Sequence, residues 1–305
     1  MKRRFMDLDA AKAIVRRTFP QLVEWRNRRR AAIARSINYH GIKMELPTNH
    51  ILLSVLKHQP RRHESVRISA AHIFRKHPDA AFVDVGANVG DTAAVVRSVS
   101  NCPMVLIEPS DVYLPYLTRN AARLGPGVKV VHGFFVTRDD LQASFDLVHG
   151  DGTARPERTS LHFDGPLNYD LDKLTDRPIK LIKIDTDGYD RHLIEGYKDD
   201  FGRCGMNVLF ELEVLSGEDV RAWTDCLANL LRRDYAGLLI WDDPGHFMCS
   251  VRAVDLADQL IRWLLSHGSL DRSGRPRRIY NFDVLALVRE DDDVLRAIEE
   301  DYRAD

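Results

Sequence analysis

A glycine-containing turn between an apolar run and a helix-like segment constrains this chain more than any other stretch. Residues 81–85 read AFVDV, residues 86–90 read GANVG, and residues 91–96 continue as DTAAVV. An apolar run followed by glycines and a helix-compatible pattern predicts a strand, a tight turn and a helix. Glycine permits positive φ and lets a ligand approach the backbone closely, and the helix start offers free N–H groups. This turn is therefore the first candidate for a ligand site.

An acidic residue at the end of the next apolar run supports a nucleoside site. Residues 104–107 read MVLI and are followed by Glu108, twenty-four positions after Asp84. A carboxylate at the tip of this second strand can accept hydrogen bonds from both hydroxyls of a ribose. The dinucleotide fingerprint G-x-G-x-x-G is absent, and D-x-G-x-N-x-G stands in its place. The alternative, glycines that only shape a turn, does not account for Glu108.

Composition limits the class of protein. With 305 residues and 44% hydrophobic content, the chain can bury the core of one α/β domain plus an extension. The net charge of −1 gives no overall field that would attract nucleic acid. Four cysteines without a C-x-x-C pair favour a reducing compartment and argue against structural zinc. Because no apolar run approaches the length of a membrane span or a signal peptide, we expect a soluble, cytoplasmic protein.

Both ends of the chain carry uneven charge. Residues 1–35 hold eleven Lys or Arg against three acids, and residues 290–305 hold eight acids against two Arg. We expect a helical N-terminal extension over residues 1–78, a main domain over 79–290 and an acidic tail over 291–305. Within the extension, helices are predicted at residues 7–36 with a break at Pro20, at 46–57 and at 64–76. The basic N-terminal helices either contact an acidic membrane surface or turn their Arg residues to solvent.

From residue 81 onward, strands and helices alternate, which predicts a mostly parallel sheet covered by helices on both faces. Residues 135–178 are irregular, and we expect them to cross the face where substrates enter. The predicted strands are at residues 81–85, 104–108, 128–131, 179–184, 207–212, 237–241 and 279–288. The third strand ends near Gly133 and Phe134, where the adenine of a bound nucleoside would lie.

A second acidic cluster follows the strand at 179–184. Asp185 and Asp187 stand at the carboxyl end of that strand, where ligands sit in open α/β sheets. Asp185 is the candidate for a general base or for a group that orients the acceptor. Alternatively, Asp185 and Asp187 could hold a divalent cation such as Mg²⁺. Glu211 ends the next strand and is a third catalytic candidate, and Asp190 would favour a helix N-terminus. A histidine could be the base instead, and the candidates are His132, His149, His162, His192 and His246.

The combination of FVDVGANVGD, LIEPS, LIKIDTDGYDRHLIEG, VLFELE and YNFDVLAL resembles the FkbM family of S-adenosylmethionine-dependent methyltransferases. The resemblance covers about residues 80–290. It implies the Rossmann-like, seven-stranded, mostly parallel α/β sheet of class I methyltransferases, with the last strand inserted antiparallel. Asp187 and Asp190 stand where the family usually has glutamates. The residues expected to contact the methyl donor are Asp84, Gly86, Ala87, Asn88, Gly90, Asp91, Glu108, Pro109, Ser110, Gly133 and Phe134.

The resemblance implies an O-methyltransferase that uses S-adenosyl-L-methionine and acts on a hydroxyl of a sugar, a glycan or a secondary metabolite. Three alternatives remain: a small-molecule N-methyltransferase, a non-catalytic nucleoside-binding module, and an NAD-dependent dehydrogenase, against which the missing fingerprint argues. Nucleic acid is not an expected partner, because basic residues concentrate in the N-terminal extension and no base-flipping signature is present. The sequence does not specify an oligomeric state.

Overall fold

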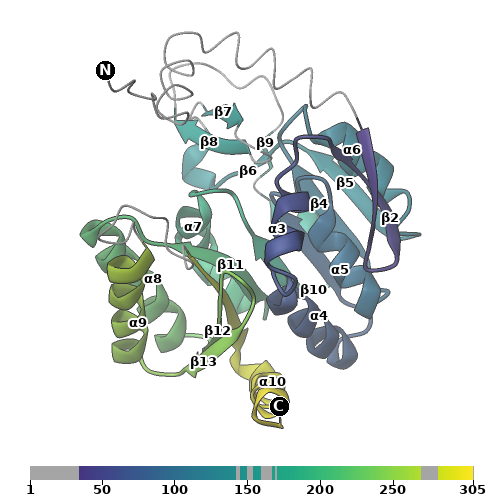
Figure 1. Ribbon diagram of the computed structural model, residues 1–305. Helices are drawn as coiled ribbons and strands as arrows, with labels where there is room; N and C mark the ends of the chain where they lie inside the picture. The colour runs from purple at the N-terminus through teal and green to yellow at the C-terminus, as the bar shows by residue number, and fades with distance from the viewer. Residues whose placement is uncertain are drawn as a thin grey trace, which may run out of the picture.

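An eight-stranded sheet runs through the centre of the computed structural model, which describes residues 34–141, 145–149, 154–158, 167–168, 170–268 and 281–304 (Figure 1). Five adjacent strands at one side of the sheet are parallel. In spatial order the strands are β13 (Phe247–Val251), β12 (Tyr235–Asp242), β14 (Asn281–Val288), β11 (Asn207–Glu213), β10 (Ile179–Ile184), β3 (Ala81–Val85), β4 (Met104–Glu108) and β5 (Val128–His132).

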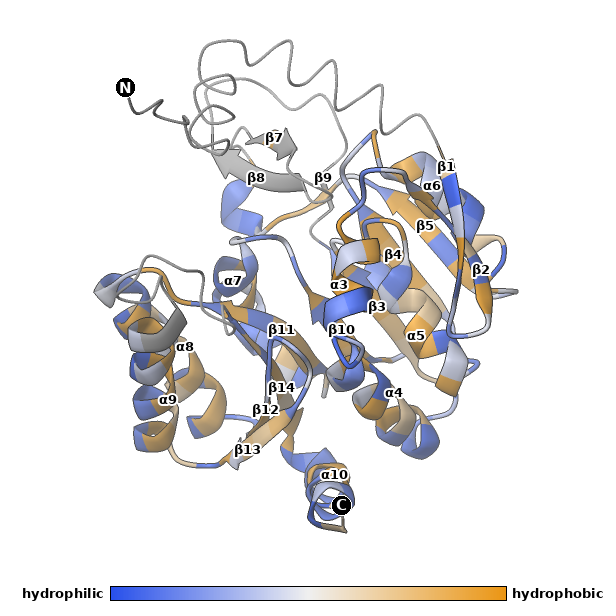
Figure 2. Cartoon of the chain, viewed as in Figure 1, coloured by the Kyte–Doolittle hydropathy of each residue, from blue (hydrophilic) through white to orange (hydrophobic). Residues whose placement is uncertain are grey.

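The central strands are mostly apolar because helices cover both faces of the sheet, and Asp84 in β3 and Glu108 in β4 are buried exceptions. Every residue of β3 and β4 is buried, as expected for parallel strands between two helical layers. One face packs against α7 (Asp190–Arg203), α8 (Gly217–Arg232) and α9 (Val254–Gly268). The other face packs against α4 (Glu64–Lys76), α5 (Asp91–Val99), α6 (Leu114–Ala121) and α10 (Asp292–Ala304). Figure 2 shows the resulting pattern, with apolar strands inside and two-coloured helices outside.

The predicted seven-stranded, Rossmann-like fold is confirmed. The last strand, β14, lies antiparallel between β11 and β12, as the class I methyltransferase sheet requires. An eighth strand, β13, pairs antiparallel with β12 at the edge. The sequence predicted no strand at these residues, since FMCSV is too short to stand out as a strand without its partner.

The region before the main domain is not wholly helical, which corrects the prediction. Residues 34–47 form a hairpin of β1 (Ala34–Tyr39) and β2 (Ile42–Pro47), where the ends of two helices were expected. His40 and Gly41 both have positive φ, which is the requirement of a type I′ two-residue turn. The short helix α3 (Leu52–His58) begins later than predicted, and α4 matches its predicted span. The basic residues of the first 33 positions lie outside the described residues.

The prediction of an acidic tail over residues 291–305 is also corrected, because residues 292–304 form helix α10. Val294, Leu295 and Ile298 are buried in the same apolar cluster as Ile73 and Phe74 of α4. The spacing of the apolar residues is that of a helix that packs by one face, and two acids of α10, Asp293 and Asp301, pair with Lys76 and His72 of α4. The high acid content concealed this pattern in the sequence.

The irregular stretch contains short elements in its described parts. These are β6 (Phe134–Phe135), the 3₁₀ turn η1 (Arg138–Asp140), β7 (Phe145–His149), β8 (Ala154–Arg158), β9 (Leu167–Asn168) and the 3₁₀ turn η2 (Leu171–Lys173). The β7–β8 hairpin projects beyond the carboxyl ends of the parallel strands (Figure 1). Across the described ranges, none of the helices has both the length and the apolar character needed to cross a membrane.

Candidate functional site

The turn after β3 explains why the sequence has glycine at 86 and tolerates asparagine at 88. Gly86, Asn88 and Gly90 all have positive φ, at 84°, 50° and 84°. Asparagine is among the few residues with a side chain that adopt this conformation readily. A Cβ on Gly86 would lie 1.9 Å from the backbone oxygen of Asp185. Gly86 therefore lets the ends of β3 and β10 approach each other directly.

Glu108 at the end of β4 is held by the backbone of this turn. Its Oε2 accepts a hydrogen bond from the Asn88 N–H and its Oε1 one from the Ser110 N–H, each at 2.8 Å. Burial raises the pKa of Glu108 to about 7, against these two hydrogen bonds, which favour the anion. Each carboxylate oxygen keeps one lone pair for a ligand.

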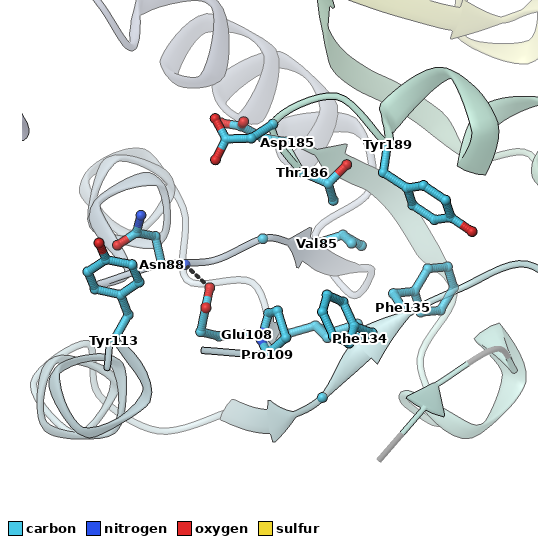
Figure 3. A pocket seen from close by; sticks show the side chains of 14 residues that line it. Val85, Asn88, Glu108, Pro109, Tyr113, Phe134, Phe135, Asp185, Thr186 and Tyr189 are labelled. Carbon is cyan, nitrogen blue, oxygen red and sulfur yellow. Dashed lines mark hydrogen bonds between the residues drawn. The ribbon is translucent and has the colours of Figure 1, made fainter. Parts of the chain in front are cut away.

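A cleft opens beside Glu108, and we call it the Glu108 cleft. It encloses about 500 Å³, including the space open to solvent, within the range of small-molecule sites. Glu108, Pro109 and Phe134 lie on one side and Asp185 and Thr186 on the other (Figure 3). The lining residues are Val85, Gly86, Asn88, Ile107, Glu108, Pro109, Tyr113, Gly133, Phe134, Phe135, Asp185, Thr186, Asp187 and Tyr189.

Behind the cleft, one lysine lies between two carboxylates. The Lys183 ammonium is 2.7 Å from Asp185 Oδ2 and 3.9 Å from Asp84 Oδ1. Asp84 is fully buried, and neither of its carboxylate oxygens has a hydrogen-bond partner among the described residues. Burial raises the pKa of Asp84 to about 7, although the Lys183 charge opposes this shift. Asp185 and Asp84 in turn hold the pKa of Lys183 above its ordinary value, so it is a permanent cation.

Asp185 differs from Asp84 because it pairs closely with this cation. Burial alone would raise the pKa of Asp185, but the charges of Lys183 and Arg62 and the hydrogen bond from Lys183 outweigh burial and hold it below its ordinary value. Asp185 is therefore ionised at neutral pH, with Oδ2 bonded to Lys183. Such a carboxylate is well suited to accept a hydrogen bond from a bound hydroxyl.

A second, larger space lies on the other side of Asp185, and we call it the His63 cavity. It encloses about 1100 Å³, including open solvent, and shares Gly86, Asn88, Asp185 and Asp187 with the Glu108 cleft. Its remaining lining residues come from α3, the segment before α4, α5, and the ends of several strands. They are His50, Ile51, Leu52, Val55, Gln59, Arg62, His63, Asp91, Thr92, Lys183, Glu211 and Asp243.

Arg62 ties the segment before α4 to the sheet. Its guanidinium forms ion pairs with Asp243 and, at 3.4 Å, with Glu211. Although burial disfavours the charge, Glu211 and Asp283 hold the pKa of Arg62 above its ordinary value. Burial raises the pKa of Glu211 well above its usual range, and the Asp185 charge adds to this shift. Glu211 also lines the His63 cavity, beside Arg62.

The structure brings together most of the residues that the sequence singled out. Asp185 and Asp187 line both spaces, and Glu211 and Asp91 line the His63 cavity. Of the expected donor contacts, six line the Glu108 cleft: Gly86, Asn88, Glu108, Pro109, Gly133 and Phe134. Asp84, Ala87, Gly90 and Ser110 lie outside this lining, and Ser110 acts on it through its N–H to Glu108.

The described histidine candidates line neither the Glu108 cleft nor the His63 cavity. His132 bonds the Pro109 carbonyl oxygen, His246 bonds Asp242 in an exposed turn, and His192 bonds Asp140 at 2.5 Å. His149 ends the short strand β7, and His162 lies outside the described residues.

Sequence reasoning missed His50, Arg62 and His63, which precede the main domain and line the His63 cavity, and Tyr39, which contacts His63. Alternation in ARSINY-HG-IKMELP was a signal for the hairpin that carries Tyr39. No comparable signal marks His63, because its partners are distant in sequence.

The structure gives little support to a cation held by Asp185 and Asp187. The Lys183 ammonium already occupies Asp185 Oδ2. The one group of three metal-ligand side chains within reach of one another, among the described residues, is His77, Glu290 and Asp291. There Asp291 is paired with Lys76 at 2.8 Å and with His77 at 2.7 Å, so an ion network accounts for it.

Residues 84–268, more than half of the chain, match the family model described as "Methyltransferase FkbM domain". No curated protein matches the chain. The matched segment contains the whole Glu108 cleft, whereas Tyr39, Arg62 and His63 precede it.

Three solved methyltransferase structures are similar at low identity. The FkbM methyltransferase from Methylobacillus flagellatus KT is 15% identical with a TM-score of 0.34, over 68% of this chain and 43% of that one. An O-methyltransferase from Bacillus cereus in complex with SAH is 12% identical with a TM-score of 0.43, over 78% and 90%. A precorrin-6y C5,15-methyltransferase from Geobacter metallireducens GS-15 is 11% identical with a TM-score of 0.37, over 73% and 87%. These likenesses are too weak to transfer a substrate.

Proposed function

This chain belongs to the FkbM methyltransferase family, and from that premise we propose that it transfers a methyl group from S-adenosylmethionine to a hydroxyl of a sugar, a glycan or a secondary metabolite. The observation that carries the proposal is that the Glu108 cleft and the His63 cavity meet at Gly86, Asn88, Asp185 and Asp187. A donor in the first space and an acceptor in the second would touch at these residues.

The Glu108 cleft fits the methyl donor. The two remaining lone pairs of the Glu108 carboxylate suit the hydroxyls of a ribose, and Pro109, Phe134 and Phe135 offer apolar surface for a base. Above about pH 7, the buried Asp84 carboxylate supplies negative charge behind the turn, which favours a cationic ligand. S-adenosylmethionine, when bound, supplies an activated methyl group on a sulfonium.

The His63 cavity fits a polar acceptor. Its wall combines carboxylates, two amides, an arginine and two histidines, which are groups that bind hydroxyls by hydrogen bonds. Asp185, ionised and held by Lys183, would accept a hydrogen bond from the reacting hydroxyl and fix its direction. Alignment of this kind supplies much of the rate enhancement in group transfer.

Calorimetric titration with S-adenosylmethionine and, separately, with NAD tests the donor. We expect binding of S-adenosylmethionine alone, unchanged by magnesium, because Lys183 occupies Asp185. Binding of NAD in preference would overturn the assignment of the Glu108 cleft.

Formation of S-adenosylhomocysteine in the presence of single acceptors tests the reaction. A suitable panel is methyl α-D-glucopyranoside, N-acetylglucosamine, UDP-glucose and quercetin, with glucosamine to report amine methylation. Turnover with a compound that has hydroxyls but no amine supports O-methylation. Turnover with glucosamine alone would indicate methylation of the amine. Donor binding without turnover on any member would instead favour a non-catalytic nucleoside-binding protein.

A further inference from the structure

One wall of the His63 cavity comes from outside the family-matched segment. Tyr39 lies at the end of β1, and His63 directly precedes α4, whereas the match begins at residue 84. Although His63 is the N-cap residue of α4, its side chain makes no capping hydrogen bond. The imidazole is therefore available for another purpose.

The two ring nitrogens of His63 have different surroundings. Nδ1 is 2.5 Å from the Tyr39 hydroxyl oxygen, and the two rings meet edge to face at 5.9 Å. Nε2 makes no hydrogen bond to any residue that the structure describes, and Asp91 Oδ2 lies 3.7 Å from it. The side chain is 15% exposed and lines the cavity. One nitrogen is thus anchored, and the other is open to a ligand beside a carboxylate.

Several other groups in this wall are poorly placed to take a proton. Lys183 and Arg62 are cations, and Asp185 is engaged by Lys183. His50 uses both ring nitrogens, because Nδ1 accepts from the Leu52 N–H at 3.2 Å and Nε2 lies 3.0 Å from Asn88 Oδ1. Burial lowers the pKa of His63 to about 4, with Arg62 and Lys183 adding to this shift and Asp91 and Asp185 opposing it. The ring is therefore neutral at physiological pH.

We propose that His63 is the general base of methyl transfer, with Tyr39 as its positioning residue and Asp91 as the carboxylate that stabilises the imidazolium. This inference rests on the hydroxyl methylation proposed above. The competent tautomer carries its proton on Nδ1, where it donates to the Tyr39 oxygen, and leaves the Nε2 lone pair toward the cavity. A base oriented by a second group and facing the reacting atom is a recurrent catalytic arrangement.

The proton and electron balance is simple. The acceptor O–H bond breaks and its proton goes to Nε2, the acceptor oxygen bonds to the methyl carbon, and the carbon–sulfur bond breaks with its electron pair left on sulfur. The hydroxyl proton becomes acidic as the new bond forms, so the base must be unprotonated and within reach rather than strong.

The test compares His63→Gln and Tyr39→Phe with His58→Gln, a matched substitution of an exposed histidine outside the cavity. With the acceptor that the panel identifies, His63→Gln should lower kcat by about 100-fold or more and leave the affinity for S-adenosylmethionine unchanged. Tyr39→Phe should cause a smaller loss, and His58→Gln none. Full turnover by His63→Gln would overturn the proposal.

A second readout does not depend on the acceptor. Long-range ¹H–¹⁵N spectra of histidine-labelled full-length protein at pH 7, with His63 assigned by its loss in His63→Gln, report the tautomer. We expect a protonated Nδ1 and an unprotonated Nε2, and a shift toward the Nε2 proton in Tyr39→Phe. A protonated Nε2 in the wild-type protein would refute the role of His63 even if no panel compound is methylated. Absence of donor binding by the wild-type protein would instead count against the proposed function.

Discussion

The Glu108 cleft and the His63 cavity share four residues, but the chain builds them in different ways. The cleft comes from short segments that follow β3, β4, β5 and β10. Each segment is positioned by a strand of the same sheet, because the carboxyl ends of parallel strands meet at one edge. The cavity adds side chains from α3, the start of α4 and the ends of β11 and β12, which are distant in sequence.

The two spaces also differ in what their shape depends on. The cleft depends on backbone features that permit few substitutions, such as the turn conformation and the two N–H groups that hold Glu108. The cavity depends on side chains, several of which precede the family-matched segment. The first arrangement suits a donor common to many enzymes, and the second suits an acceptor particular to one.

Gly86 belongs to both spaces, so its substitution should have the largest effect. Gly86→Ala places a Cβ 1.9 Å from the Asp185 oxygen at a φ of 84°. Positive φ and overpacking together should lower the free energy of unfolding by about 4 kcal/mol. Gly41→Ala is the matched control, because Gly41 also has positive φ but a Cβ there would meet nothing within 4 Å. Denaturant unfolding should show a clearly smaller loss of unfolding free energy for Gly41→Ala than for Gly86→Ala. Equal losses in the two variants would mean that β3 and β10 do not touch at Gly86.

Lys183 compensates the charges of Asp84 and Asp185, of which Asp185 lies where the two spaces meet. Lys183→Met leaves the buried Asp84 and the partly exposed Asp185 without their cation, and removal of one partner from a buried ion pair costs about 3 kcal/mol. Lys173→Met, in which a lysine that is 77% exposed loses its pair with Asp170, should change the free energy of unfolding by less than about 1 kcal/mol. Similar melting temperatures for the two variants would argue against a buried charge cluster.

Asp185→Asn should affect the reaction of the acceptor without affecting the binding of the donor. The amide keeps the shape of the side chain but loses the charge that orients an acceptor hydroxyl, so we expect turnover to fall by about 100-fold. Affinity for S-adenosylmethionine, measured by calorimetry, should stay within a factor of two because Glu108 and the β3 turn are unchanged. Undiminished turnover would exclude Asp185 from the reaction, and lost donor affinity would mean that Asp185 acts on the donor and not on the acceptor.

The same contrast decides how much could be predicted from the sequence. The β3 turn, Glu108 and Asp185 follow apolar strands directly, so local patterns predicted their shared location. The hairpin at 34–47 and helix α10 were missed because charge or helix propensity masked their periodicity. The ion pairs of Arg62 with Glu211 and Asp243, and the contact of Tyr39 with His63, depend on packing between distant segments. Such contacts leave no local signal in one sequence.

The smallest expected effect concerns proton release when the donor binds. Burial raises the pKa of Glu108 to about 7, and acceptance of both ribose hydroxyls requires its ionised form. Below pH 7 the donor must therefore displace a proton, so its affinity should fall by at most about tenfold per pH unit and level off above pH 7. Calorimetry between pH 5.5 and about 8.5, in buffers of different ionisation enthalpy, measures both the affinity and the released proton.

Glu108→Gln should weaken donor binding and flatten this pH dependence. Asp84 has a similar pKa of about 7, so Asp84→Asn is the matched control: a dependence that disappears there and persists in Glu108→Gln would assign the proton to Asp84 and not to the residue that faces the ribose.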